Sequence, residues 1–315
     1  MPKSGASSPT LLAAVLCFNV LGAACGGGAG SEAPAASAAD QDSPTPSGSP
    51  VKKPTGTGGL DSLDDLKQKL RTSAGTKLDL AAKGWGAELG RVLGSADTLS
   101  SLERLDVSDN DLGPEGARGL LGSSHLGALT VLDLGGNEIG DPGAKALGES
   151  KLEHLTTLNL SANGISTDGA KALANGRGYP SLSSLDLSMN PVGAEGVKAL
   201  GSAGLSKLSA LFLLGSEIGP DGAKALAKGS MKLKVLALSG NSIGDDGAKA
   251  LAGSAKLASL NTLDLSANGI GDAGAKALAA SPHLKGLTKL EMFSNDLTPV
   301  GKKALSKRFG DAVKL

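Results

Sequence analysis

The feature that most constrains this chain is an internal repeat that covers most of its length. The repeating frame is LxxLxLxxNxIGxxGAKAL, and its central leucine recurs every 25 to 27 residues. A period of this length is typical of a solenoid, in which each unit packs only against its neighbours. Eight units are clear, and their central leucines are Leu105, Leu132, Leu158, Leu185, Leu211, Leu236, Leu263 and Leu290.

Each unit joins a strand pattern to a helix pattern. The LxLxx part alternates apolar and polar residues, whereas Ala and Leu in the GAKAL part recur at helical spacing. The frame therefore predicts an alternation of short strands and helices. Because aromatic residues make up only 2 % of the chain, the core must be built from Leu, Ile, Val and Ala.

An asparagine follows the strand part of nearly every clear unit. Its amide can bond backbone groups of adjacent turns, which predicts an asparagine ladder along the stack. Ser216 replaces the asparagine in the fifth clear unit, so we expect that layer to be less well tied. The ladder residues are Asn110, Asn137, Asn163, Asn190, Asn241, Asn268 and Asn295.

From about Leu78 to Leu305 the chain resembles the ribonuclease-inhibitor-like class of leucine-rich repeat proteins. The resemblance implies an α/β leucine-rich repeat solenoid, a horseshoe or arc, with parallel strands on the concave face and helices on the convex face. It also implies a binding protein whose concave face contacts a partner, and no cofactor.

Composition divides the chain into three parts. Residues 1–25 resemble a signal peptide, and residues 26–59 are a Gly, Ala, Ser and Pro-rich tether that cannot bury enough apolar surface to fold. Residues 60–315 form the repeat domain. Within it we expect an N-terminal cap and degenerate repeat over 60–101, eight clear repeats over 102–306, and a C-terminal cap over 307–315.

The N-terminal segment predicts export. Lys3 precedes an apolar run from Leu11 to Val20, and small residues follow up to Cys25. This end resembles a bacterial lipoprotein lipobox with lipid attachment at Cys25, although Gly22 stands where that family usually has Leu. We therefore expect a lipid-anchored protein of the cell envelope; cleavage at a nearby A-x-A-like site would instead give a soluble secreted protein.

Between and after the strand leucines, side chains are expected to face the concave surface. The middle position is acidic in five of the eight clear units, at Asp106, Asp133, Asp186, Asp264 and Glu291. Such a row could attract a basic partner, or it could be one aspartate copied by duplication that only solvates the strands. The flanking ligands of a Ca²⁺ site are missing.

The acidic row is interrupted in the fifth clear unit. Ala210, Phe212 and Leu214, beside Val235 and Ala237, predict an apolar patch in the middle of the polar face, and such patches often mark binding sites. The alternative is that this unit is simply degenerate. Phe293, at the position of Leu214 in the last clear unit, completes the candidate partner-binding set.

Other function classes find little support. The 31 basic and 31 acidic residues cancel, and most helix lysines follow an acidic residue by three positions, which argues against nucleic acid as a partner. Cys17 and Cys25 are the only cysteines, and no nucleophile, phosphate-loop or metal-ligand motif is present.

The sequence thus predicts a monomeric, non-enzymatic protein–protein interaction module that contacts the membrane only through its lipid. Two alternatives stay open, a regulator or inhibitor of a partner enzyme and an envelope spacer without a specific ligand. The expected partner-binding residues are Asp106, Asp133, Asp186, Ala210, Phe212, Leu214, Val235, Asp264, Glu291 and Phe293.

Overall fold

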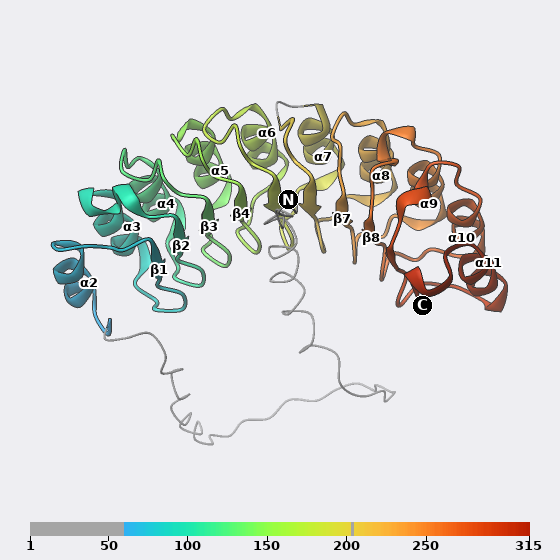
Figure 1. Cartoon of the computed structure of the whole chain (residues 1–315), viewed down its shortest axis with the longest axis horizontal. Helices are drawn as coiled ribbons and strands as arrows, with labels where there is room; N and C mark the ends of the chain where they lie inside the picture. The colour runs from blue at the N-terminus through green and yellow to red at the C-terminus, as the bar shows by residue number, and fades with distance from the viewer. Residues whose placement is uncertain (1–59, 203–204) are drawn as a thin grey trace, which may run out of the picture. The chain divides into compact units, whose positions relative to one another are not determined.

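The computed structural model describes residues 60–202 and 205–315. In these ranges the strands form one parallel sheet in which each strand pairs with the next along the chain, as predicted (Figure 1). The strands are β1 (Lys77–Asp79), β2 (Arg104–Asp106), β3 (Val131–Asp133), β4 (Thr157–Asn159), β5 (Ser184–Asp186), β6 (Ala210–Phe212), β7 (Val235–Ala237), β8 (Thr262–Asp264), β9 (Lys289–Glu291) and β10 (Val313–Lys314).

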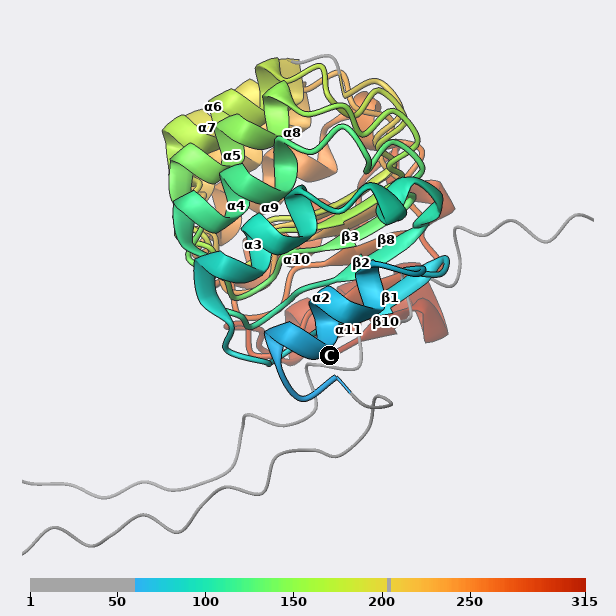
Figure 2. The same cartoon turned by 90° about the vertical axis from the view of Figure 1, so that its left-hand side faces the viewer.

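Helices alternate with the strands and stack side by side on the outer side of the arc of residues 60–315, while the sheet lies on the inner side (Figures 1 and 2). The sheet is open, so the repeat domain is an arc. The helices are α2 (Leu63–Leu70), α3 (Gly86–Gly94), α4 (Gly113–Leu121), α5 (Gly140–Glu149), α6 (Thr167–Asn175), α7 (Gly193–Ser202), α8 (Gly219–Lys228), α9 (Gly244–Ala252), α10 (Asp272–Ala279) and α11 (Pro299–Phe309).

One continuous apolar core lies between the sheet and the helices. The central strand leucines are at most 1 % exposed, and the leucines two residues later, such as Leu134 and Leu160, are fully buried. The period-two pattern therefore turns one set of side chains of each strand inward. The core contains almost no aromatic side chains and passes through every layer.

Small residues allow the helices to approach one another closely. A methyl group on Gly274 would lie 3.0 Å from the Cβ of Ala248 in the preceding helix, and one on Gly247 would lie 3.0 Å from the Cβ of Ala223. The Gly-Ala pair of each GAKAL segment is thus a contact in which the glycine faces the preceding helix and the alanine faces the following one.

The asparagine ladder forms as predicted. The Asn137 side-chain nitrogen donates to the Val107 carbonyl of the preceding repeat at 2.9 Å. Its Oδ1 accepts from the N–H groups of Asn110 and Leu112 at 3.1 and 3.3 Å. Each ladder side chain thus satisfies backbone groups that are buried between two layers, where an unpaired group costs about 1–3 kcal/mol.

Ser216 weakens the ladder, which confirms the expectation for that layer. Its hydroxyl donates to the Leu187 carbonyl at 3.2 Å, but it accepts from neither Asn190 nor Val192. The Val192 N–H turns to the Asn190 carbonyl instead, at 2.7 Å. Among the hydrogen bonds of the described residues, the N–H of Asn190, a residue only 1 % exposed, has no acceptor.

Aspartates also tie neighbouring repeats together at the helix starts, a role that the sequence did not reveal. The Asp245 Oδ1 accepts from the N–H groups of Gly271 and Gly274 in the next repeat, each at 2.8 Å. Asp272 accepts in the same way from Thr298 and Gly301, at 3.0 Å each. These carboxylates supply acceptors at the amino ends of α10 and α11.

Further elements lie at the two ends of the repeat domain. Helix α2 precedes β1 and α3 in the segment predicted to hold an N-terminal cap and a degenerate repeat. At the other end, α11 continues to Phe309, and β10 adds a strand to the sheet that the repeat pattern did not predict. The predicted signal segment, Cys25 and the tether lie outside the described residues.

Candidate binding face

The strand register brings the predicted site residues into rows. In the middle row, Asp106 pairs with Asp133 and Asp186 pairs with Phe212. Because neighbouring strands lie about 4.8 Å apart, side chains of one row are within reach of each other. The full middle row is Asp79, Asp106, Asp133, Asn159, Asp186, Phe212, Ala237, Asp264 and Glu291.

The acidic side chains of the middle row have a structural role. The Asp106 Oδ1 accepts from the N–H of Ser108 at 3.0 Å and from its hydroxyl at 2.7 Å. Asp186 and Asp264 accept from the N–H two residues later at 2.8 and 2.9 Å. Each therefore closes a turn where its strand ends, which gives repeat duplication a physical reason to retain an aspartate here.

Asp133 is the most perturbed member of the row. Its pKa is raised to about 6, chiefly because burial disfavours the charged carboxylate. The carboxylates of Asp106 and Asp186 raise the pKa as well, whereas hydrogen bonds from the Gly135 N–H and the Asn159 amide lower it. The Asn159 amide donates to the Asp133 Oδ1 at 2.9 Å, so the asparagine in the row separates two carboxylates and pairs with one of them.

Asp264, on the other side of the interruption, behaves similarly. It is 6 % exposed, and burial is the main reason that its pKa is raised. At the end of the row, Glu291 forms an ion pair with Lys289 on the same strand, with 3.0 Å between nitrogen and oxygen. The negative charge at this end of the row is therefore compensated within the strand.

The fifth clear unit replaces the turn-closing acceptor. Phe212 cannot accept a hydrogen bond, and the N–H of Leu214 is instead satisfied by the Ser188 hydroxyl of the preceding repeat at 3.2 Å. The loss of the aspartate is therefore compensated locally.

The exposed apolar patch expected at this unit requires correction. Phe212 is 5 % exposed and Ala237 is 8 % exposed, although neither belongs to the core between sheet and helices. Leu214, Ala210 and Val235 are half-buried. The physical reason is the curvature of the sheet, whose inner side chains crowd one another across strands.

Met189 is the exposed apolar residue that sequence reasoning missed. It is 60 % exposed, and its N–H donates to the Leu214 carbonyl at 2.6 Å, so it borders the interruption. It sits at a left-handed backbone position, with φ of 58°, where Ala162 and Ala267 stand in other units. The sequence signal that could have revealed this residue is the size of its side chain, which is much larger than that of the alanines at the same position of these other repeats.

In the last clear unit the position of Leu214 is taken by Phe293, which is 46 % exposed. Phe293 follows β9, whereas Leu214 follows β6, so the two side chains belong to distant layers of the stack. The sequence-predicted site residues therefore share one face, but they do not gather into a single compact patch.

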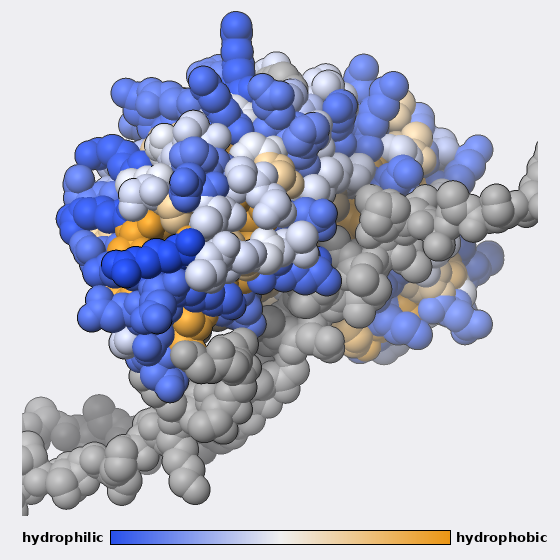
Figure 3. Space-filling model, turned by 60° about the vertical axis from the view of Figure 1, so that its left-hand side comes forward, coloured by the Kyte–Doolittle hydropathy of each residue, from blue (hydrophilic) through white to orange (hydrophobic). Residues whose placement is uncertain are grey.

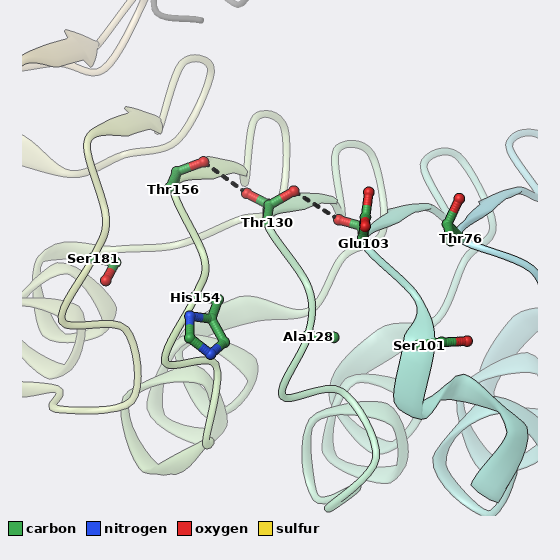
Figure 4. Close-up of a pocket in the computed structure, with 8 residues that line it drawn as sticks. All are labelled: Thr76, Ser101, Glu103, Ala128, Thr130, His154, Thr156 and Ser181. Carbon is green, nitrogen blue, oxygen red and sulfur yellow. Dashed lines mark hydrogen bonds between the residues drawn. The ribbon is translucent and has the colours of Figure 1, made fainter.

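A shallow polar groove follows the starts of the first strands (Figure 4). The Thr130 hydroxyl donates to the Glu103 carbonyl, and the Thr156 hydroxyl donates to the Thr130 carbonyl, both at 3.0 Å. These hydroxyls form a second ladder along the stack. His154 and Ser181 also line the groove, but no hydrogen bond joins the imidazole to the other side chains drawn.

No metal-binding cluster is found in the described part of the chain. No group of three or more His, Cys, Asp or Glu side chains there could hold a metal ion. None of the helices in residues 60–202 and 205–315 is both long and apolar enough to span a membrane.

The convex face is charged but compensated. Basic residues pair with the acidic residue three positions earlier, as the sequence predicted, at Arg118–Glu115, Lys171–Asp168, Lys198–Glu195, Lys224–Asp221 and Lys249–Asp246, with nitrogen–oxygen distances from 2.8 to 3.2 Å. In Figure 3, which brings the side of α2 and α3 forward, the surface outside the grey atoms is mostly hydrophilic.

Six segments of the chain match the model of a family described as Leucine Rich repeat, over residues 98–121, 129–148, 151–174, 180–201, 229–252 and 256–279. These segments are leucine-rich repeats. The fold of the described domain is accordingly a leucine-rich repeat solenoid, a scaffold typical of protein-interaction modules. The unit that holds β6 and α8, with Phe212 and Ser216, is not among the matched segments.

No curated protein matches this chain. Solved structures do, among them the crystal structure of an internalin from Listeria monocytogenes. It is 18 % identical, with 79 % of this chain and 88 % of that chain covered and a TM-score of 0.38.

Proposed function

We propose that this leucine-rich repeat protein is a non-enzymatic interaction module that binds a partner protein on its concave face. The observation that carries the proposal lies at β6, where Phe212 interrupts the acidic row. The apolar side chains of Met189 and Leu214 lie beside this interruption. A 60 % exposed methionine bordered by polar residues is a favourable contact for a protein surface.

Phe212 takes a different role in this proposal from that expected of an exposed anchor. Because Phe212 is almost fully buried, it packs beneath the binding surface, and Leu214 and Met189 contact the partner. The acidic residues before the interruption, such as Asp106 and Asp186, favour a basic partner surface and raise the rate of approach more than the final affinity.

Photocrosslinking in intact cells tests this proposal. A photoreactive amino acid at position 189 should give a discrete crosslinked protein, whereas the same group at Lys198 on the convex face should not. Leu214→Ser, which installs the residue found at Ser161 and Ser188, should reduce the crosslink without unfolding the domain. Equal crosslinking from both positions, or no effect of Leu214→Ser, would contradict the concave contact.

The identity of the captured protein separates this proposal from its alternatives. If it is an enzyme whose rate changes when the solenoid is added, the protein is a regulator. If no crosslink forms from any concave position, the spacer alternative holds instead.

The proposal includes a lipid anchor on Cys25, supported by the lipobox-like sequence before it. Cys25→Ala should release the full chain from membranes to the soluble fraction, and retention of that variant would argue against the anchor. It also includes the ribonuclease-inhibitor-like subtype, supported by repeats of 25 to 27 residues that each contain a helix of eight or more residues.

A further inference from the structure

Helix α11 departs from the charge pattern of the other repeats. Its sequence PVGKKALSKRF holds four basic residues and no acidic one. In α4, α6, α7, α8 and α9, by contrast, a basic residue is paired with an acidic one. The last helix therefore concentrates positive charge, whereas the basic residue of these five earlier helices is paired.

The departure centres on Val300. This residue occupies the repeat position of Glu115 and Glu195, three residues before the basic side chain, so Lys303 lacks the usual partner. Val300 is also 54 % exposed. Because Val300, Lys303 and Lys307 are three and four residues apart, they form one stripe along the helix.

Lys302 marks a second face of the same helix. A methyl group on Gly301 would lie 3.3 Å from the Cβ of Ala275, so α11 packs on α10 through the same Gly-to-Ala contact as the earlier helices. Lys302 takes the place of the alanine that would face a following helix, and it is exposed. Among the described residues, Lys302, Lys303 and Lys307 form no ion pair.

Exposed apolar side chains gather in the same last layers. Of the four large apolar residues that are exposed in the described ranges, three lie from Phe293 onward: Phe293 at 46 %, Val300 at 54 % and Leu315 at 37 %. Asp311 is the only acidic residue after Asp296. Cations interspersed with exposed apolar side chains are the combination found on surfaces that rest on anionic lipid.

We propose that the C-terminal end of the solenoid, formed by α11 and Val300, is a docking surface for an anionic phospholipid bilayer. Lys302, Lys303 and Lys307 contact the headgroups, and Val300 enters the interface. A single-stranded nucleic acid would call for exposed aromatic side chains on which bases stack, and the exposed apolar residue of α11 is the aliphatic Val300. The proposal is independent of the concave contact and of the lipid on Cys25.

Vesicle co-sedimentation of the full chain tests it, with Cys25→Ser as the common background so that no attached lipid contributes. Binding to vesicles of phosphatidylglycerol and phosphatidylcholine should exceed binding to phosphatidylcholine alone. The triple variant Lys302→Gln, Lys303→Gln, Lys307→Gln should bind the anionic vesicles on the order of 100-fold more weakly, at about 1 kcal/mol for each lysine.

A matched control removes the same number of charges elsewhere. Lys171→Gln, Lys198→Gln, Lys224→Gln neutralises three lysines that are already paired, and it should bind like the parent. Val300→Glu restores the acidic position of the other repeats and should weaken binding roughly tenfold with an unchanged helix content.

The proposal is overturned if the two triple variants lose binding equally, or if neutral and anionic vesicles bind alike. It is also overturned if an acidic polypeptide or a single-stranded oligonucleotide displaces the vesicles at a lower concentration of negative charge than phosphatidylglycerol itself.

Discussion

Replacing Asp133 by asparagine should make the repeat domain more stable at neutral pH. Asparagine has the same shape and keeps the Oδ1 that accepts from the Gly135 N–H at 2.9 Å. The next strand already shows this arrangement, because Asn159 accepts from the Ser161 N–H at the same distance. The substitution therefore removes a charge without removing the turn-closing hydrogen bond.

The size and sign of the effect follow from the pKa of Asp133. Folding raises it from 3.8 to about 6, and two pKa units correspond to about 3 kcal/mol. The folded state binds the proton more tightly than the unfolded state, so the free energy of unfolding falls as pH rises from about 4 to 6. Asp133→Asn should therefore raise the free energy of unfolding by about 2–3 kcal/mol above pH 6 and by little at pH 4.

Urea unfolding of parent and variant at pH 4, 5, 6 and 7 measures this difference. The two curves should be close at pH 4 and separate as the pH rises. Asn159→Asp is the reciprocal variant: it places a new carboxylate beside Asp133 and removes the amide that donates to it, so it should destabilise the domain most at neutral pH. A gain from Asp133→Asn that is equal at pH 4 and pH 7 would refute the role of ionisation.

Further predictions concern the contacts between layers. Asn137→Ala leaves two buried N–H groups unpaired and should lower the free energy of unfolding by about 2–6 kcal/mol in urea titrations; a loss below 1 kcal/mol would contradict the ladder. Ser216→Asn supplies the missing acceptor and should raise the free energy of unfolding by about 1–2 kcal/mol, whereas an unchanged value would mean that the neighbouring repeats have adapted. Tyr179→Phe removes the 2.7 Å bond from its hydroxyl to the Leu173 carbonyl and should cost about 1 kcal/mol by the same assay. Lys198→Ala removes only an exposed ion pair and should leave the thermal midpoint unchanged.

The scaffold could be predicted well because the same residue pattern, and with it the same contact between layers, recurs in each repeat. The leucine spacing located β2 to β9, the asparagines located the ladder, and Ser216 located its weak layer. The acid–base pairs of the convex face followed from residues three apart on a helix, which needs only local geometry.

The binding face was harder to predict because exposure depends on curvature, which a residue pattern does not contain. Phe212 was expected at the surface and is 5 % exposed, while Met189, at an inconspicuous position before the ladder asparagine, is 60 % exposed. The contact of Asp245 with the next helix and the pairing of β10 were likewise missed, because each joins residues that the repeat frame does not align.

The two hydrogen bonds that Ser216 does not accept also determine where the domain would begin to unfold under a stretching force. In a stack where every layer touches only its neighbours, a force applied at Leu60 and Leu315 passes through each junction in turn. At the junction between the β5 and β6 layers, Ser216 accepts no hydrogen bond from the preceding repeat, whereas each ladder asparagine accepts two. Stretching should therefore open the solenoid there first, into two blocks that each retain an unbroken asparagine ladder.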